Sequence, residues 1–353
     1  MAKKQFSKRP PRKAQRLSKK QQSTVSDNLQ KRIEQLRTDN ALEATVISHM
    51  GYNVIVQTAA GAPLLACDWR QNIGAICAGD QVLISEQSTP ADNASDSGNT
   101  HYRIEAVLPR TSVIEKQNVY RGAKPFAANI DQLLVIITHE PMFQASLLDR
   151  YLIMAHEVGV DALIYFNKVD ILTDANIIAH VQRLQAIYEA IPNVRWVSGS
   201  LKTADGLDDL QAQLDNRKTV ITGQSGVGKS TLINALIPDI DVQTMSISEA
   251  SGLGRHSTTN STLYRLNADT MHAGILIDTP GVRSFDTYHL SPEAIQNGFA
   301  DIAPLIGHCR FSDCSHTHEA GCAIKQAVST GEISQLRYDS FLQTLTESQR
   351  HDR

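Results

Sequence analysis

Long hydrophobic runs are missing from this sequence of 353 residues. The longest apolar stretch, Leu133–Ile137, has the length of a buried strand and is far too short to span a membrane. The N-terminus is basic but lacks the apolar segment of a signal peptide, so we do not expect export. With 41% apolar and 20% charged residues, the composition is that of a folded protein, and the length suits two or three domains. We therefore expect a cytoplasmic protein with no membrane partner.

Acidic residues are absent from the beginning of the chain, where none precedes Asp27. The basic residues before that point are Lys3, Lys4, Lys8, Arg9, Arg12, Lys13, Arg16, Lys19 and Lys20. Residues 1–40 lack apolar periodicity and predict a tail with a short helix near Leu29–Leu36. Such a tail either binds a polyanion such as nucleic acid or only keeps the protein in solution, and charge alone does not decide between the two.

Cysteine is scarce, and the count of 5 is odd, which does not suit a disulfide framework. Cys67 and Cys77 stand alone and are predicted to be ordinary small apolar residues. The other three crowd together with histidines near the C-terminus, which is typical of a reduced, cytosolic protein with a metal site. The predicted ligands of a closed, structural Zn²⁺ site are Cys309, Cys314, His316 and Cys322. His318 is an alternative ligand to His316.

Short strand patterns separated by turn residues begin at about Ala44. They are Thr45–Ser48, Asn53–Thr58, Pro63–Cys67, Gln81–Ser85 and Tyr102–Val107. Five strands in about seventy residues predict a small barrel of the oligonucleotide-binding type, although composition does not separate it from an SH3-like barrel. The polar stretch Glu86–Thr100 predicts a long loop between the last two strands.

From about Ala128 the pattern changes to alternating strands and helices. The predicted strands are Leu133–Ile137, Ala162–Phe166, Trp196–Val197, Thr219–Ile221 and Ile275–Ile277, and the helices are Ser146–Val158, Ile177–Ile191 and Leu207–Leu214. This alternation predicts an α/β fold with a mainly parallel sheet covered on both faces, which binds ligands at the carboxyl ends of its strands. After Ser291 the sequence predicts helices at Glu293–Ile302, Ala323–Val328 and Ser334–Ser348. There is no internal repeat.

A phosphate-binding loop of the pattern G-x-x-x-x-G-K-[ST] follows the strand at Thr219–Ile221. Its residues are Gly223, Gln224, Ser225, Gly226, Val227, Gly228, Lys229 and Ser230. The glycines let the backbone wrap the phosphates, so that N–H groups and the N-terminus of the next helix face the anion. Lys229 is expected to reach the β- and γ-phosphates, the Ser230 hydroxyl to coordinate Mg²⁺, and Thr231 to contact the α-phosphate.

A guanine-reading motif follows the strand at Ala162–Phe166. It consists of Asn167, Lys168, Val169 and Asp170. The Asp170 carboxylate is expected to accept both the N1–H and the 2-amino hydrogen of guanine, which adenine does not offer. Asn167 is expected to contact the base edge, and the stem of Lys168 to pack on its face. Ser198, Gly199 and Ser200 follow the next strand, and their N–H groups are expected to bind the guanine carbonyl.

The remaining parts of a GTPase site lie between the phosphate loop and Gly281. Asp278 at a strand end is expected to hold Mg²⁺ through water, and the N–H of Gly281 to sense the γ-phosphate. Thr258 or Thr259 is expected to complete the magnesium coordination, and spacing does not choose between them. Position 282 is valine, where Ras-like enzymes carry a water-positioning glutamine. His256 is therefore the predicted catalytic group beside Lys229, and slow intrinsic turnover is expected.

These motifs occur in a rotated order, with the guanine motif before the phosphate loop. A sheet tolerates such a rotation because joining nearby termini preserves the strand contacts. The order, the segment Gly254-Arg255-His256 before a Ser/Thr run, the segment Asp278–Arg283 and the cysteine cluster resemble the circularly permuted GTPase family RsgA, also called YjeQ. The resemblance covers about residues 40–350. The threonine run usual in that family begins here with Ser257.

The resemblance implies a GTP hydrolase that binds the small ribosomal subunit and its 16S rRNA, assists late maturation, and is stimulated by that subunit. It implies an oligonucleotide-binding barrel at 41–115, a permuted GTPase domain at 116–288 and a zinc-binding helical domain at 289–353, after a basic tail at 1–40. We expect a monomer with Mg²⁺-bound GTP and one Zn²⁺. Two other interpretations are a phosphate-loop kinase of a small molecule and a non-catalytic nucleic-acid-binding scaffold.

Overall fold

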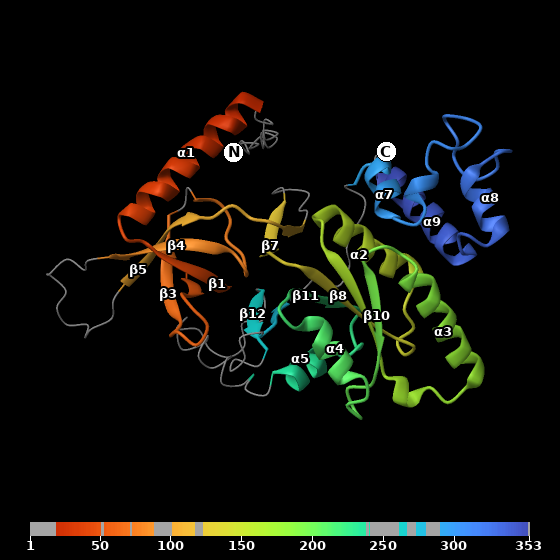
Figure 1. Ribbon diagram of the computed structural model, residues 1–353, viewed down its shortest axis with the longest axis horizontal. Helices are drawn as coiled ribbons and strands as arrows, with labels where there is room; N and C mark the ends of the chain where they lie inside the picture. Colours follow the sequence, from red (N-terminus) through yellow and green to blue (C-terminus); the bar gives the residue numbers. More distant parts are fainter. Residues whose placement is uncertain are drawn as a thin grey trace, which may run out of the picture.

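The computed structural model describes residues 19–50, 53–70, 73–87, 101–116, 123–237, 240, 261–266, 273–279 and 290–351. Figure 1 shows three parts: a barrel near the N-terminus, a central sheet flanked by helices, and a group of C-terminal helices. None of the helices in these ranges combines the length and the apolar character that crossing a bilayer requires.

Five strands form the N-terminal barrel. They are β1 (Leu42–Met50), β2 (Asn53–Gln57), β3 (Leu65–Trp69), β4 (Gln81–Gln87) and β5 (His101–Val107). β1 pairs with both β2 and β4, and the pairs β2–β3, β3–β5 and β5–β4 close the ring. Each predicted strand overlaps an observed one, and the closed barrel confirms the oligonucleotide-binding type of fold. β4 includes Glu86 of the predicted loop, and positions 88–100 lie outside the described residues.

A helix longer than predicted precedes the barrel. α1 spans Lys19–Thr38, which extends well beyond the predicted segment Leu29–Leu36. It docks through Ile33, which is buried against Leu83 of β4 and Ala106 of β5 on the outside of the barrel. In Figure 1 the N-terminal part of the helix projects away from the barrel. Arg32 of α1 also lies 3.5 Å from the carboxylate of Glu105 on β5, so an apolar contact and an ion pair together orient the helix.

The central sheet is mainly parallel. Its strands are β8 (Gln132–Thr138), β9 (Asp161–Asn167), β10 (Val194–Ser198), β11 (Lys218–Gly223) and β13 (Ile275–Asp278), with the antiparallel β12 (Thr262–Arg265) beside β13. The spatial order is β10-β9-β8-β11-β13-β12. The predicted parallel sheet is confirmed, and its neighbouring strands come from distant parts of the chain.

Side chains of β8 alternate between the two faces of this sheet. Leu133 and Val135 pack into a core with α2 (Ala145–Val158) and α3 (Ala175–Glu189). Leu134 and Ile136 pack into a second core with α4 (Leu207–Leu214) and α5 (Lys229–Leu236). Because both faces are covered, the strand carries a continuous apolar run rather than an alternating one.

The barrel is joined to the central sheet by a strand pairing. β1 pairs with β12 at Ser48 and Thr262, and the Ser48 hydroxyl donates a hydrogen bond of 3.3 Å to the carbonyl of Ser261. Between the two parts lies a hairpin of β6 (Val113–Lys116) and β7 (Lys124–Ala128), which the sequence pattern does not predict. The described strands therefore run without a break from the barrel into the sheet.

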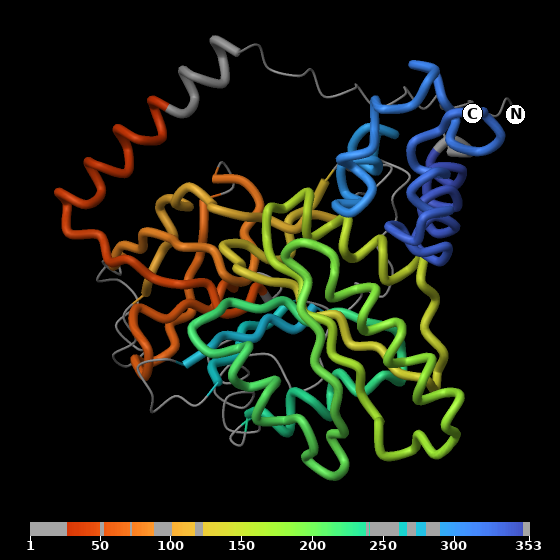
Figure 2. The backbone as a smooth tube through the Cα atoms, turned by 45° about the vertical axis from the view of Figure 1, so that its right-hand side comes forward, coloured from red at the N-terminus to blue at the C-terminus, as the bar shows by residue number. Residues whose placement is uncertain are grey.

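The C-terminal helices form a core of their own. They are α7 (Pro292–Gly298), η4 (Ala303–Leu305), α8 (Ala323–Thr330) and α9 (Gln335–His351). α7 and α9 pack against α2, as Figure 2 shows at the upper right. The predicted helix Glu293–Ile302 is shorter in the structure, because the chain turns at Phe299 into η4.

A buried arginine joins these helices to the central domain. The side chain of Arg337 on α9 is 2% exposed, and its guanidinium lies 2.5 Å from the carboxylate of Asp149 on α2 and 2.7 Å from that of Asp301. It also lies 4.6 Å from the ring centre of Phe299. Burial opposes the charge of Arg337, but the two carboxylates raise its pKa above the ordinary value. The arginine therefore stays charged in this contact.

Candidate functional site

Four loops meet at one edge of the central sheet. They follow β9, β10, β11 and β13, parallel strands whose carboxyl ends point the same way. The last residues of these strands are Asn167, Ser198, Gly223 and Asp278. Each predicted nucleotide motif therefore begins at the same edge, although the motifs are spread along the sequence from 167 to 278.

The loop after β11 has the backbone that a phosphate-binding loop needs. Gly223, Gly226 and Gly228 have positive φ angles of 141°, 83° and 104°, a region that favours glycine. A Cβ on Gly228 would also lie 2.5 Å from the side-chain nitrogen of Asn167. α5 begins at Lys229, so the unpaired N–H groups of its first turn lie directly after the loop. The exposed residues here are Ser225, Gly226, Ser230 and Thr231, while Val227 is buried.

Lys229 folds back over its own loop. Its ammonium donates hydrogen bonds to the carbonyls of Gly223 (2.6 Å) and Gln224 (2.5 Å). The same ammonium lies close enough to Asp278 to affect its ionisation: burial raises the pKa of Asp278, and Lys229 opposes that shift. A half-buried carboxylate of this kind gains from a bound cation. The residue after it, Thr279, donates a hydrogen bond of 3.4 Å to the carbonyl of Ile221 on β11.

The Asn167 side chain ties three loops together. Its Nδ2 donates to the carbonyl of Val227 in the phosphate loop over 2.8 Å. Its Oδ1 accepts from the N–H of Lys168 (2.8 Å) and from that of Leu201 after β10 (3.2 Å). Because the side chain is 3% exposed, these are strong constraints. The guanine motif and the phosphate loop are therefore in direct contact.

The loop after β10 orients the carboxylate of Asp170. The Ser200 hydroxyl donates to Asp170 Oδ1 over 2.6 Å, and the N–H of Val169 donates to the carbonyl of Gly199 over 3.2 Å. A Cβ on Gly199 would lie 2.4 Å from the carbonyl oxygen of Asp205, so no larger residue fits there. Asp170 is exposed, while Gly199 and Ser200 are buried beneath it. This arrangement leaves the aspartate available to a ligand and fixes its position.

A further segment borders the site that the sequence motifs do not reveal. It follows β8, which lies between β9 and β11, and so enters the same edge. Lys168, with a positive φ of 66°, donates from its ammonium to the carbonyl of Glu140 over 2.8 Å. Pro141 lies beside Gly226, where a Cβ would be 3.8 Å from the proline ring. This segment could have been predicted from the sequence, because β8 was predicted as a strand of the same parallel sheet and its carboxyl end therefore lies at the same edge.

Several predicted site residues lie outside the described part of the chain. They are His256, Thr258, Thr259 and Gly281, together with Ser257 and Val282. Their predicted roles stay predictions.

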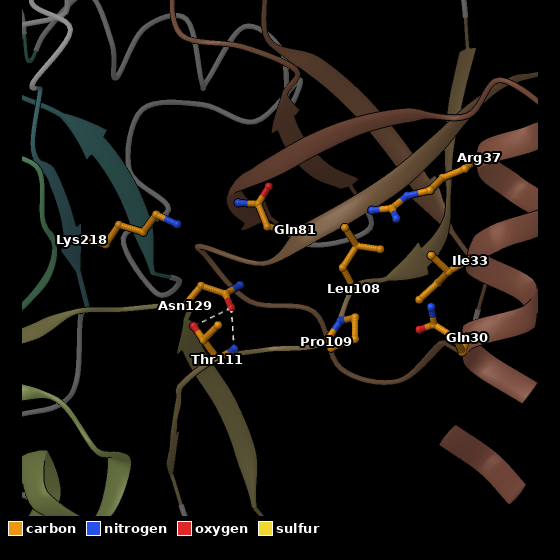
Figure 3. Close-up of a pocket in the computed structure, with 9 residues that line it drawn as sticks. All are labelled: Gln30, Ile33, Arg37, Gln81, Leu108, Pro109, Thr111, Asn129 and Lys218. Atoms are coloured by element: carbon orange, nitrogen blue, oxygen red, sulfur yellow. Dashed lines mark hydrogen bonds between the residues drawn. The ribbon is translucent and has the colours of Figure 1, made fainter. Parts of the chain in front are cut away.

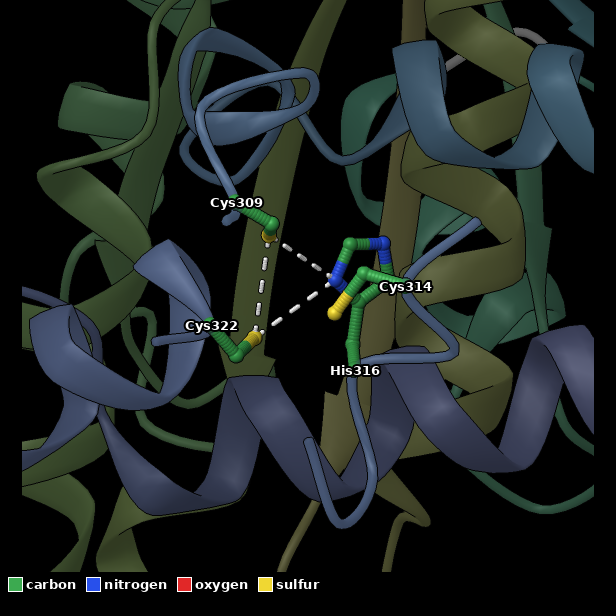
Figure 4. A group of neighbouring side chains, drawn as sticks. All are labelled: Cys309, Cys314, His316 and Cys322. Atoms are coloured by element: carbon green, nitrogen blue, oxygen red, sulfur yellow. Dashed lines mark hydrogen bonds between the residues drawn. The ribbon is translucent and has the colours of Figure 1, made fainter. Parts of the chain in front are cut away.

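The cysteine cluster is assembled as predicted. The ligand atoms of Cys309, Cys314, His316 and Cys322 all lie within 4.8 Å of one another (Figure 4). The Cys309 and Cys322 sulfurs are 3.8 Å apart, and His316 Nδ1 lies 3.5 Å and 3.6 Å from them. A tetrahedron with metal–sulfur bonds of about 2.3 Å has sulfur–sulfur edges of about 3.8 Å. The spacing therefore fits one tetrahedral metal ion.

The surroundings of the cluster support metal binding. Burial lowers the pKa of His316, with Glu319 opposing, and so favours the neutral imidazole that ligates metals. The N–H of Ala323 donates to the Cys309 sulfur over 3.4 Å, and the Tyr338 hydroxyl on α9 donates to the His316 carbonyl over 2.6 Å. The side chain of His318 is 85% exposed and lies outside the group. The geometry thus favours His316 over His318.

Residues 107–288 match the model of the RsgA GTPase family. A relative from Vibrio vulnificus (strain YJ016), named small ribosomal subunit biogenesis GTPase RsgA 1, is 37% identical over 338 residues, with 93% of each chain covered. A relative from Dichelobacter nodosus with the name small ribosomal subunit biogenesis GTPase RsgA is 39% identical, covering 94% of this chain and 98% of its own.

Two solved structures share the fold. The crystal structure of YjeQ from Thermotoga maritima has a TM-score of 0.66 and 27% identity, covering 87% of this chain and 98% of that one. The structure of YloQ, a circularly permuted GTPase, has a TM-score of 0.64 and 25% identity, covering 88% and 96%. These likenesses confirm the permuted fold, and they favour GTP hydrolysis over the kinase and scaffold interpretations. The chain belongs to the RsgA GTPase family and is a GTP-hydrolysing enzyme.

Proposed function

We propose that the edge described above binds one guanine nucleotide with Mg²⁺. The observation that carries this proposal is the hydrogen bond from Asn167 to Val227, because it holds the base-reading loop against the phosphate loop. Asp170 reads the guanine edge and the loop at Ser198–Ser200 lines it. Gly223–Thr231 wrap the phosphates. Ser230 and Asp278 would hold Mg²⁺, which would neutralise part of the phosphate charge.

Catalysis in this proposal depends on groups from two segments, one at positions 256–259 and one at Gly281. Thr258 or Thr259 completes the magnesium coordination, the Gly281 N–H contacts the γ-phosphate, and His256 orients the attacking water. Lys229, which now donates to its own loop carbonyls, turns to the phosphate oxygens when GTP binds. Valine at position 282 has no side-chain amide to position the attacking water, so the isolated enzyme is expected to turn over slowly.

The Cys3His cluster holds one Zn²⁺ with a structural role in this proposal. Its four ligands fill the tetrahedron and leave no position for substrate. A metal at this point would join the start of α8, at Cys322, to the loop that carries Cys309, Cys314 and His316, and so would fix this loop on the core of the C-terminal helices.

We further propose that the enzyme acts in the cytoplasm, as a monomer, in late maturation of the small ribosomal subunit. The names of the relatives support this assignment. The barrel at 41–115 and the basic N-terminus are of the kind that binds 16S rRNA, the domain at 116–288 carries the nucleotide, and the unit at 289–353 carries the zinc. Binding to the subunit completes the catalytic arrangement and stimulates hydrolysis.

The decisive experiment measures GTP turnover with purified small subunits, with large subunits and with protein-free 16S rRNA. Stimulation by small subunits alone supports the proposal. Equal stimulation by all three contradicts a specific role in the small subunit. Lys229→Ala is expected to abolish nucleotide binding and serves as the negative control.

A further inference from the structure

A polar groove lies at the opposite end of β11 from the nucleotide edge. It has a volume of about 360 Å³ and is formed by α1, the barrel and the first residue of β11 (Figure 3). This volume is within the usual range of ligand clefts, roughly 300–1,000 Å³. The cleft is distinct from the nucleotide site, because β11 begins at Lys218 in the groove and ends at Gly223 in the phosphate loop.

The groove is cationic. Arg37 of α1 and Lys218 of β11 enter it from opposite sides in Figure 3, and no carboxylate is among the residues that line it. The Lys218 ammonium has no hydrogen-bond or ion-pair partner within the described ranges. Arg37 pairs with Glu43 at 2.6 Å, but both side chains are more than half exposed, at 53% and 54%. Such an exposed pair contributes little and yields readily to a stronger anion.

The walls between these cations are preformed. The Asn129 side chain accepts from the N–H of Thr111 over 2.9 Å and donates to the carbonyl of Gly79 over 3.0 Å. The Gln81 side chain donates to the Thr45 hydroxyl over 3.0 Å. These bonds hold the polar walls in place, and Leu108 and Pro109 supply an apolar part of the lining. A ligand therefore meets a rigid surface that needs little ordering.

The groove lacks the features of a site for a small free phosphate. Such sites are usually built from several unpaired backbone N–H groups. Here the N–H of Leu108 donates to the carbonyl of Gln81, that of Thr111 to Asn129, and that of Lys218 to the carboxylate of Asp131. What the groove offers instead is separated side-chain cations, next to a helix that continues outward with the exposed Lys31. This arrangement suits an extended polyanion.

We propose that this groove seats the sugar-phosphate backbone of an RNA strand, with Arg37 and Lys218 each contacting a phosphate. The proposal deepens the function proposed above and rests on it. Because the groove includes the first residue of β11, it places RNA contact on the barrel, on α1 and on the GTPase sheet at once.

The test measures binding of the full chain to small subunits, in the presence of a non-hydrolysable GTP analogue, between roughly 50 and 200 mM salt. The double variant Arg37→Gln/Lys218→Gln is expected to weaken binding on the order of tenfold. It should also reduce the slope of log K against log salt by roughly 0.7 to 0.9 for each lost contact. Arg37→Lys/Lys218→Arg should retain the wild-type slope, because phosphate contacts require charge more than shape.

Two further variants sharpen the test. Glu43→Gln frees Arg37 from its partner and should strengthen binding. Arg183→Gln, an exposed arginine on α3, is the matched control and should bind as the wild type does. Thermal unfolding of each variant checks that the fold is retained. A double variant with wild-type affinity and slope would contradict RNA binding in the groove, and it would leave the function proposed above unaffected.

If the wild type does not bind small subunits, the proposed function fails, and a single-stranded RNA oligonucleotide then tests the groove by the same comparison. Competition experiments distinguish other anions. The competitors are poly-glutamate and inorganic phosphate at millimolar concentration. If either displaces RNA from the wild type but not from the double variant, RNA is not the specific ligand of the groove.

Discussion

Asn167 makes hydrogen bonds within the protein that the sequence did not predict. Its amide is bonded to Lys168, Leu201 and Val227, and the predicted contact with the guanine edge stays a prediction. The motif predicted that Asn167 belongs to the nucleotide site. It did not predict the hydrogen bonds to the other loops, because the order of the strands alone brings those loops together.

Replacing Asp170 by asparagine is expected to weaken GTP binding about 10- to 100-fold, because hydrogen bonds to a charged group are worth about 1.5–3 kcal/mol. XTP binding should improve, since an asparagine amide can donate to the carbonyl that xanthine carries in place of the 2-amino group. Titration with the two nucleotides measures both changes. Asp208→Asn, at an exposed position of α4, is the control. If Asp170→Asn binds GTP as tightly as the wild type does, the guanine base is not bound by Asp170.

Tyr165 is expected to make stability fall at alkaline pH. Burial, with a smaller effect of Asp205, raises the pKa of Tyr165 to about 12, whereas an unfolded tyrosine titrates near pH 10. Between these values the unfolded chain loses a proton that the folded chain keeps, so the free energy of unfolding falls as pH rises. Tyr165→Phe should make this decline shallower.

At neutral pH the same substitution should cost little, because the Tyr165 hydroxyl has no hydrogen-bond partner among the described residues. Urea unfolding at several pH values checks both statements. Tyr102→Phe, at a partly exposed position, is the control. Identical pH profiles for wild type and Tyr165→Phe would contradict the expectation.

Among the elements, those with a regular local pattern were predictable. The five barrel strands and the β/α alternation follow from side-chain periodicity, and the glycines of the phosphate loop follow from its fixed spacing. The hairpin β6–β7 and the segment after β8 carry no such signal. They are set by contacts with parts of the chain that are distant in sequence.

The contact of α9 with α2 was also unpredictable, because nothing in the sequence distinguishes Arg337 from an exposed arginine. Its partner Asp149 is fully buried, and burial raises the pKa of that carboxyl against the opposing effect of Arg337. Arg337→Met leaves Asp149 buried without its counter-ion, and should lower the free energy of unfolding by about 3–5 kcal/mol.

The urea midpoint measures this loss. The double variant Asp149→Leu/Arg337→Met should recover part of it, because the fully buried carboxylate is gone, although Asp301, which is 16% exposed, still lacks its partner. Arg183→Met on α3 is the matched control. A single variant as stable as this control would show that the pair contributes nothing to the contact between the two parts.

Removal of zinc should unfold the loop of the cysteine cluster and loosen α8. His316→Ala is expected to lose bound zinc and to expose residues 307–323 to protease, because metal binding replaces a larger hydrophobic core there. His318→Ala and Cys67→Ser should keep one zinc per chain. Metal analysis with limited proteolysis gives the result, and zinc retention by His316→Ala would favour His318 as the ligand.

At the scale of the whole molecule, the proposed site has one nucleotide contacting four loops that the sequence separates widely. A ligand that binds only the folded state stabilises it by about 2.7 kcal/mol at a concentration of 100 Kd. GTP with Mg²⁺ is therefore expected to raise the melting temperature of the full chain. Lys229→Ala should remove this shift, measured by differential scanning fluorimetry against the melting temperature of the same variant without nucleotide. A shift that persists in Lys229→Ala would contradict the assignment of the phosphate loop.

The pairing of β1 with β12 has a consequence for signalling between nucleotide and RNA. Thr258 and Thr259, the candidates for sensing the γ-phosphate, lie two to four positions before Ser261 and Thr262, the residues that join the barrel. The carbonyl of Ser261 accepts a hydrogen bond from the Ser48 hydroxyl, and Thr262 pairs with Ser48 in the sheet. The barrel is thus anchored within three residues of a predicted magnesium ligand. If the proposed sites are right, a change at Thr258 or Thr259 on loss of the γ-phosphate would be transmitted to the barrel, the proposed RNA-binding part, through this short stretch of backbone.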